Sequence, residues 1–110
     1  MNRQHRELAD GRWNKLSFLG QMANVGSEVE RALNWKKKKN FGYCQLSFER
    51  ALELLDLTIE NSAGFSRLKE LLRVKEALVD HFFEMNYFMS SDESWRKYFL
   101  PFMLAARKNY

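Results

Sequence analysis

The residues most able to do chemistry in this sequence are clustered cations. Lys36, Lys37, Lys38 and Lys39 follow Trp35 in an unbroken run, and a second basic set lies towards the C-terminal end, comprising Arg96, Lys97, Arg107 and Lys108. Lysine and arginine bind phosphate groups through charge, without reading base sequence. The pattern predicts a contact with RNA or DNA. The alternative is a solvated helix end, where cations interact favourably with the helix dipole.

A second polar group follows one side of a helical stretch and consists of Gln21, Asn24, Glu28 and Arg31. Their spacing of three, four and three residues places them at the edge of the apolar face of that helix. We expect a polar interface at this edge. The alternative is that these side chains bond to one another or to neighbouring helices.

Lys75 is a charge at a position that faces the core. Around it on the helical pattern lie Leu68, Leu71, Leu72, Leu78, Val79 and Phe82. An unpaired charge is costly in such surroundings, so the lysine must reach solvent or pair with a carboxylate. Glu28 and Asp56 are the predicted partners.

Several large apolar residues point away from the main apolar faces of their helices: Tyr43, Leu46, Leu54, Leu57, Leu100 and Leu104. Scattered surface leucines are ordinary, but several in so small a chain indicate a second covered face. We therefore expect self-association or a protein partner to bind these residues.

Residues suited to enzymatic chemistry are sparse. The one cysteine, Cys44, excludes an internal disulfide, and with two distant histidines it does not form an ordinary zinc site. Cys44 and His81 could pair across helices, but a lone cysteine in an apolar helix is usually a small core residue. There is no glycine-rich phosphate loop, so we expect no metal, cofactor or small-molecule substrate, and a non-catalytic protein.

The elements that must position these residues are helices. The chain has 110 residues, a formal net charge of +4 and a pI near 9.3, which is the size of one domain. Fifteen Leu against four Val, one Ile and one Thr favour helix over sheet. The apolar residues recur with helical periodicity over about 12–38, 43–61, 66–84 and 91–108.

These stretches predict an all-α, antiparallel four-helix bundle of residues 12–110, preceded by a polar N-terminal segment at 1–11. Ser90 and Glu93 form a capping-box pattern for the fourth helix. Pro101 should kink or break that helix. The first twelve residues have no apolar core of a signal peptide and no apolar run could span a membrane, so we expect a cytoplasmic protein.

Four segments resemble a small, widespread prokaryotic family of uncharacterised helical proteins. They are Gln21–Lys38, Phe48–Ile59, Arg67–Leu78 and Tyr98–Arg107. The resemblance implies a helical bundle and transfers no catalytic residues. In size, charge and helix number the chain is also similar to the basic four-helix accessory proteins of reverse transcriptases in diversity-generating retroelements. That analogy implies an oligomeric accessory protein that helps a nucleic-acid enzyme or ribonucleoprotein to bind RNA or DNA.

Two other functions stay open. One is a HEPN-like ribonuclease or a toxin–antitoxin component. HEPN ribonucleases are also basic helical bundles, with an arginine followed by a histidine after four to six residues. The nearest pair here is Arg73 and His81, with seven residues between them. The other possibility is an adaptor that binds only proteins.

Overall fold

A computed structural model describes residues 13–108 of the protein, which within that range form four α-helices and no strand. α1 spans Phe18–Lys37, α2 spans Phe41–Glu60, α3 spans Phe65–Phe83 and α4 spans Asp92–Lys108. The prediction of an all-α four-helix bundle is confirmed. The predicted segment 1–11 lies outside the described residues.

The first helix begins later than the periodicity indicates. A 3₁₀ turn at Trp13–Lys15 precedes it, and the predicted start at residue 12 lies outside the described residues. Ser17, two residues after this turn, caps α1, because its Oγ accepts a hydrogen bond from the backbone N–H of Gly20 at 3.1 Å. A serine at this position satisfies one of the free N–H groups of the first helical turn.

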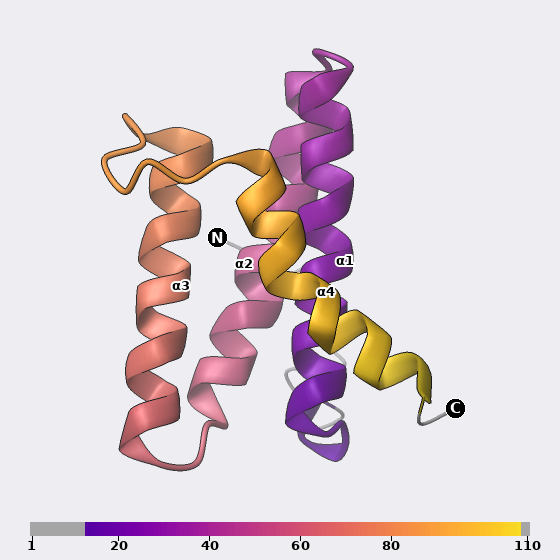
Figure 1. Ribbon diagram of the computed structural model, residues 1–110, viewed down its shortest axis with the longest axis vertical. Coiled ribbons are helices and arrows are strands. Elements are labelled where there is room, and N and C mark those ends of the chain that lie inside the picture. Colours follow the sequence, from indigo (N-terminus) through magenta and orange to yellow (C-terminus); the bar gives the residue numbers. More distant parts are fainter. Residues whose placement is uncertain (1–12, 109–110) are drawn as a thin grey trace.

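The middle of the molecule is formed by α1 and α2. α1 packs against α2 and α4, and α2 also contacts α3 (Figure 1). The short connections at 38–40 and 61–64 make α1, α2 and α3 consecutive antiparallel neighbours. α4 crosses α1 obliquely and continues through Pro101, changing direction near its middle. The proline therefore bends the helix without ending it.

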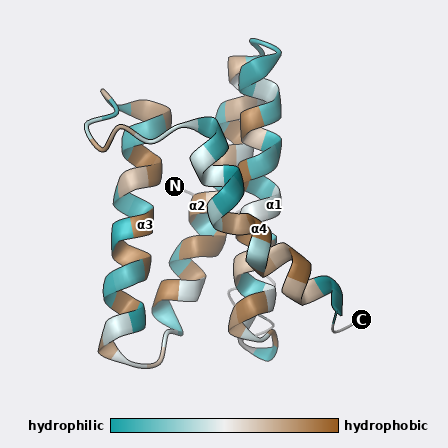
Figure 2. Ribbon diagram, viewed as in Figure 1, coloured by the Kyte–Doolittle hydropathy of each residue, from teal (hydrophilic) through white to brown (hydrophobic). Residues whose placement is uncertain are grey.

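Hydrophobic and hydrophilic residues recur in turn around the helices (Figure 2), and the hydrophobic ones meet in one core. Trp13 is buried in this core and donates a hydrogen bond from Nε1 to Thr58 Oγ1 of α2 at 3.0 Å. Gly26 allows α1 and α4 to approach closely, since a Cβ atom there would lie 2.9 Å from Phe99 Cβ. No helix within residues 13–108 is long and apolar enough to cross a membrane.

Two expectations about helix faces are wrong. Leu54 and Leu57, predicted to bind a partner, are only 4% and 2% exposed. The reason is that α2 has neighbours on two sides, α1 and α3, and therefore needs two apolar faces. Leu72 of α3, expected in the core, is 49% exposed, because α3 packs on α2 alone over most of its length.

Candidate functional site

A group of polar side chains joins the ends of α1, α3 and α4; we call it the polar hub. It consists of Lys36, His81, Ser90, Asp92 and Trp95. His81 Nε2 lies 2.8 Å from Asp92 Oδ1, and Lys36 Nζ donates to the same oxygen at 3.0 Å. Ser90 Oγ lies 3.1 Å from His81 Nδ1 and accepts a hydrogen bond from Trp95 Nε1 at 3.1 Å. The hub therefore fixes the start of α4 against two other helices.

The hub also shifts the pKa of its carboxyl group. Burial alone would raise the pKa of Asp92, but the hydrogen bonds from His81 and Lys36 more than reverse this and hold the pKa below its usual range. Cys44 lies close enough to feel these charges: burial raises the pKa of its thiol, and the charge of Lys36 opposes that. The thiol is therefore less reactive than a free one.

The two pairs that an alternative catalytic function would use, Cys44 with His81 and Arg73 with His81, are not assembled in this arrangement. His81 makes its hydrogen bonds with Ser90 and Asp92, and no hydrogen bond joins it to Cys44 within the described residues. Arg73 is exposed and lies eight residues before His81 on α3, about 12 Å along the helix axis. Across residues 13–108, His, Cys, Asp and Glu side chains form no group of three that could hold a metal ion.

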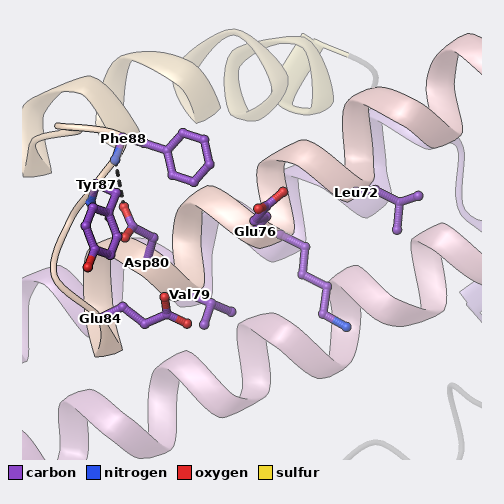
Figure 3. A pocket seen from close by; sticks show the side chains of 8 residues that line it. Leu72, Glu76, Val79, Asp80, Glu84, Tyr87 and Phe88 are labelled. Carbon is purple, nitrogen blue, oxygen red and sulfur yellow. Dashed lines mark hydrogen bonds between the residues drawn. The ribbon is translucent and has the colours of Figure 1, made fainter.

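The backbone of the connection between α3 and α4 is held by two polar side chains, of which Asp80 is buried and Asn86 is partly exposed. Asp80 is 2% exposed, and its two carboxylate oxygens accept hydrogen bonds from the N–H groups of Tyr87 at 2.8 Å and Phe88 at 3.0 Å (Figure 3). Asn86 has φ 56° and exchanges hydrogen bonds with the backbone of Ser90 through both ends of its amide. A conformation that is strained for most residues is thus stabilised locally.

This anchored connection turns large apolar side chains outwards; we call its four exposed members the apolar loop. Met85 is 78% exposed, Tyr87 75%, Phe88 57% and Met89 87%. Aromatic residues and methionine are enriched in protein interfaces. These residues were missed by the sequence reasoning, although the signal was present: a connection between two helices is ordinarily polar, and this one contains four large apolar residues.

A groove of about 530 Å³ lies between the apolar loop and one face of α3. Leu72 and Val79 line it along the helix, and Tyr87 and Phe88 line it from the loop (Figure 3). Glu76 and Glu84 add two exposed carboxylates to the same wall. Lys75 also lines the groove, but its ammonium group pairs with Asp56 of α2 at 2.7 Å.

That ion pair shows how the charge of Lys75 is compensated. Of the two expected partners, Asp56 is the one that binds it, and both side chains are about 40% exposed. Lys75 thus reaches the boundary between α2 and α3, where solvent screens the pair, and it is not a buried charge.

The predicted nucleic-acid residues do not form one surface. Lys36 is bound to Asp92, and Arg96 Nε lies 3.1 Å from both carboxylate oxygens of Glu30. Lys97 pairs weakly with Glu93 at 3.4 Å, and Lys38 lies over the Trp35 ring. Of the eight predicted nucleic-acid residues, those with no ion pair to another described residue are Lys37, Lys38, Lys39, Arg107 and Lys108. The last two lie at the far end of α4 from the lysine run.

The polar stripe on α1 makes mostly local bonds. Gln21 is buried, and its Nε2 donates to the backbone oxygens of Trp13 at 3.0 Å and Leu16 at 3.3 Å. Asn24 is exposed and bonds to the Gly20 carbonyl, while Arg31 pairs with Glu28 at 3.0 Å. Gln21 therefore fastens the turn before α1, in agreement with the alternative of internal hydrogen bonding for that residue.

Of the residues expected to bind a partner, four are exposed: Tyr43, Leu46, Leu100 and Leu104. Tyr43 lies against Trp35, with ring centroids 4.9 Å apart. Leu100 and Leu104 lie one turn apart on α4.

The fold and this geometry define an all-α four-helix protein with an exposed apolar loop. Comparison of the chain with protein-family models, curated proteins and solved structures finds no match. The resemblances drawn from the sequence therefore stay predictions.

Proposed function

We propose that this chain is a non-catalytic helical adaptor, which binds another protein chain through the apolar loop. The observation that carries the proposal is the outward display of Met85, Tyr87, Phe88 and Met89 by a backbone anchored on the buried carboxylate of Asp80. The hydrogen bonds to Asp80 hold this connection in the conformation in which the four apolar side chains are exposed.

The exposed area is of the size that protein interfaces use. With a full side chain of this type worth roughly 200 Å², the four side chains expose on the order of 600 Å² of surface. That is the upper end of the largest apolar patch on a typical monomer. It also approaches the roughly 800 Å² that each partner contributes to a standard interface.

The anchoring of the loop favours binding energetically. The hydrogen bonds from the N–H groups of Tyr87 and Phe88 to Asp80, and those of Asn86 to Ser90, order the backbone before any partner arrives. A preorganised surface loses less conformational entropy on association. Methionine side chains stay adaptable within such a surface and fit irregular apolar partners.

A contact with nucleic acid is the second candidate, at the connection between α1 and α2. Its support is that Lys37 and Lys39 have no ion pair to any residue in the range 13–108 and are exposed to solvent. Such a contact would serve the predicted role of assisting a nucleic-acid enzyme. The separation of these lysines from Arg107 and Lys108 makes it the smaller of the two candidate surfaces.

Site-specific photocrosslinking in the source cell tests the adaptor function. Tyr87 is replaced by p-benzoylphenylalanine, and the matched control carries the same residue at Phe65, which is 80% exposed at the opposite end of α3. We expect a discrete protein adduct from position 87 and none from position 65. Equal labelling from both positions, or no adduct from either, would contradict the proposal.

A further inference from the structure

The groove beside the apolar loop has the length of a short helix. Leu72, Glu76, Val79 and Glu84 follow one another along one side of α3 and its end. Residues 72 and 84 are twelve positions apart, which corresponds to about 18 Å along a helix axis. Tyr87 and Phe88 close the groove from the loop (Figure 3).

The charge of the groove is negative. Glu76 and Glu84 have no ion-pair partner within residues 13–108. The one cation in the wall, Lys75, is neutralised by Asp56 at 2.7 Å. The groove therefore suits an apolar helix that also carries positive charges.

The same chain contains a helix face of that description. On the C-terminal half of α4, the exposed residues Leu100 and Leu104 are followed by Arg107 and Lys108. Leu104 lies four residues after Leu100, and Arg107 and Lys108 lie three and four residues after Leu104, which places these side chains on one face of the helix. Neither cation has an ion pair with another described residue.

We propose that the groove of one copy holds the outer face of α4 from a second copy. This inference rests on the proposed function and names its partner. Leu100 and Leu104 pack against Leu72, Val79 and Phe88, and the two cations pair with Glu76 and Glu84. Each copy carries both surfaces, so two copies related by a two-fold axis would make this contact twice in a closed dimer.

Charge reversal tests the contact in solution. One variant carries Glu76→Arg and Glu84→Arg, so its groove and its α4 face are both positive. The other carries Arg107→Glu and Lys108→Glu, so both of its surfaces are negative. We expect the wild-type protein to sediment as a dimer at micromolar concentration and each variant alone as a monomer of about 13.2 kDa. Mixing the variants restores opposite charges at both contacts and should restore the dimer.

A matched control separates this contact from a general effect of charge. Lys37→Glu with Lys39→Glu changes the net charge as much as the α4 variant, at exposed positions outside both surfaces. We expect this control to remain dimeric. Circular dichroism of all variants verifies that helicity is kept.

Three results would overturn the inference: a monomeric wild-type protein at every concentration, a dimer that survives both reversals, or folded variants whose mixture does not associate. The proposed adaptor function is tested separately, by the crosslinking experiment. A crosslink from position 87 to a different protein would support the adaptor function even where self-association fails.

Discussion

The connections α1–α2 and α3–α4 lie near each other, because Lys36 before the first binds Asp92 just after the second at 3.0 Å. Their chemistry differs. The first, at 38–40, is short and basic, and its lysines extend into solvent. The second, at 84–91, is longer and apolar, and its backbone is held by Asp80 and Asn86.

The difference shows which surface needs an explanation. Cations at the end of α1 interact favourably with the helix dipole and stay hydrated, so they are ordinary whether or not they bind a partner. Exposed methionine and aromatic side chains are unfavourable in water, and the α3–α4 connection holds them there with a buried carboxylate. The apolar loop is therefore the stronger candidate for a functional surface than the lysine run.

The largest expected effect comes from removing the anchor of the apolar loop. Asp80→Ala leaves the N–H groups of Tyr87 and Phe88 without their acceptor and should lower the free energy of unfolding by about 4 kcal/mol, since each hydrogen bond to a charged group contributes about 2 kcal/mol. Urea denaturation measures the loss, and amide hydrogen exchange should quicken at both residues. Glu84→Ala is the exposed control, expected within about 0.5 kcal/mol of wild type. An unchanged midpoint for Asp80→Ala would show that the loop is not anchored as described.

A smaller loss of stability should follow from a substitution that pushes α4 away from α1. The contact between these two helices brings the two connections together. Gly26→Leu forces a side chain against Phe99, whose Cβ lies 2.9 Å from the position of the new Cβ atom. Overpacking of this kind costs about 3 kcal/mol. A Cβ atom at Gly20 on the same helix would lie 3.4 Å from Ser17 Oγ and 3.8 Å from Leu16 Cβ, so Gly20→Ala should leave stability equal or higher by up to about 1 kcal/mol. Thermal unfolding with equal losses in both variants would contradict the close approach at Gly26.

The four helices were predictable because their apolar periodicity is a local property of the chain. Periodicity predicts an apolar face for the second helix, but it also leads to the prediction that Leu54 and Leu57 bind a partner. Periodicity shows that a face is apolar and does not show which neighbour covers it; here the neighbours are helices of the same chain.

The polar hub could not be predicted for a related reason. Its members come from three helix ends, and Lys36 and Asp92 lie 56 residues apart. The capping pattern was also displaced by one residue: Ser91 and Ser94 exchange the capping bonds, and Ser90 bonds to Trp95 and lies beside His81 instead. When adjacent serines compete for one cap, the tertiary contacts decide between them.

Lowering the pH should weaken the ion pair between Lys36 and Asp92, which links the two connections. The lowered pKa of Asp92 means that its contribution to stability is present above its unfolded value of 3.8 and is lost as the pH falls through the lower folded pKa. Asp92→Asn should cost about 1 kcal/mol near neutral pH, a small value because the pair is partly exposed. The difference in the free energy of unfolding between Asp92→Asn and the wild-type protein should therefore shrink as the pH is lowered. Urea titrations at several pH values measure this difference, and a difference that stayed constant down to low pH would contradict the contribution of the Asp92 carboxylate.

The smallest effect on stability should come from the lysine run. Lys37→Gln with Lys39→Gln removes two solvated charges and should change the free energy of unfolding by less than about 0.5 kcal/mol. Lys36 is kept because it belongs to the hub. If this connection binds nucleic acid, anisotropy with a single-stranded RNA should show weaker binding and a salt slope reduced by about 1.4. Lys15→Gln with Lys69→Gln removes the same charge elsewhere. Equal weakening in this control would assign binding to net charge, and no binding by wild type at low salt would leave the apolar loop as the functional surface.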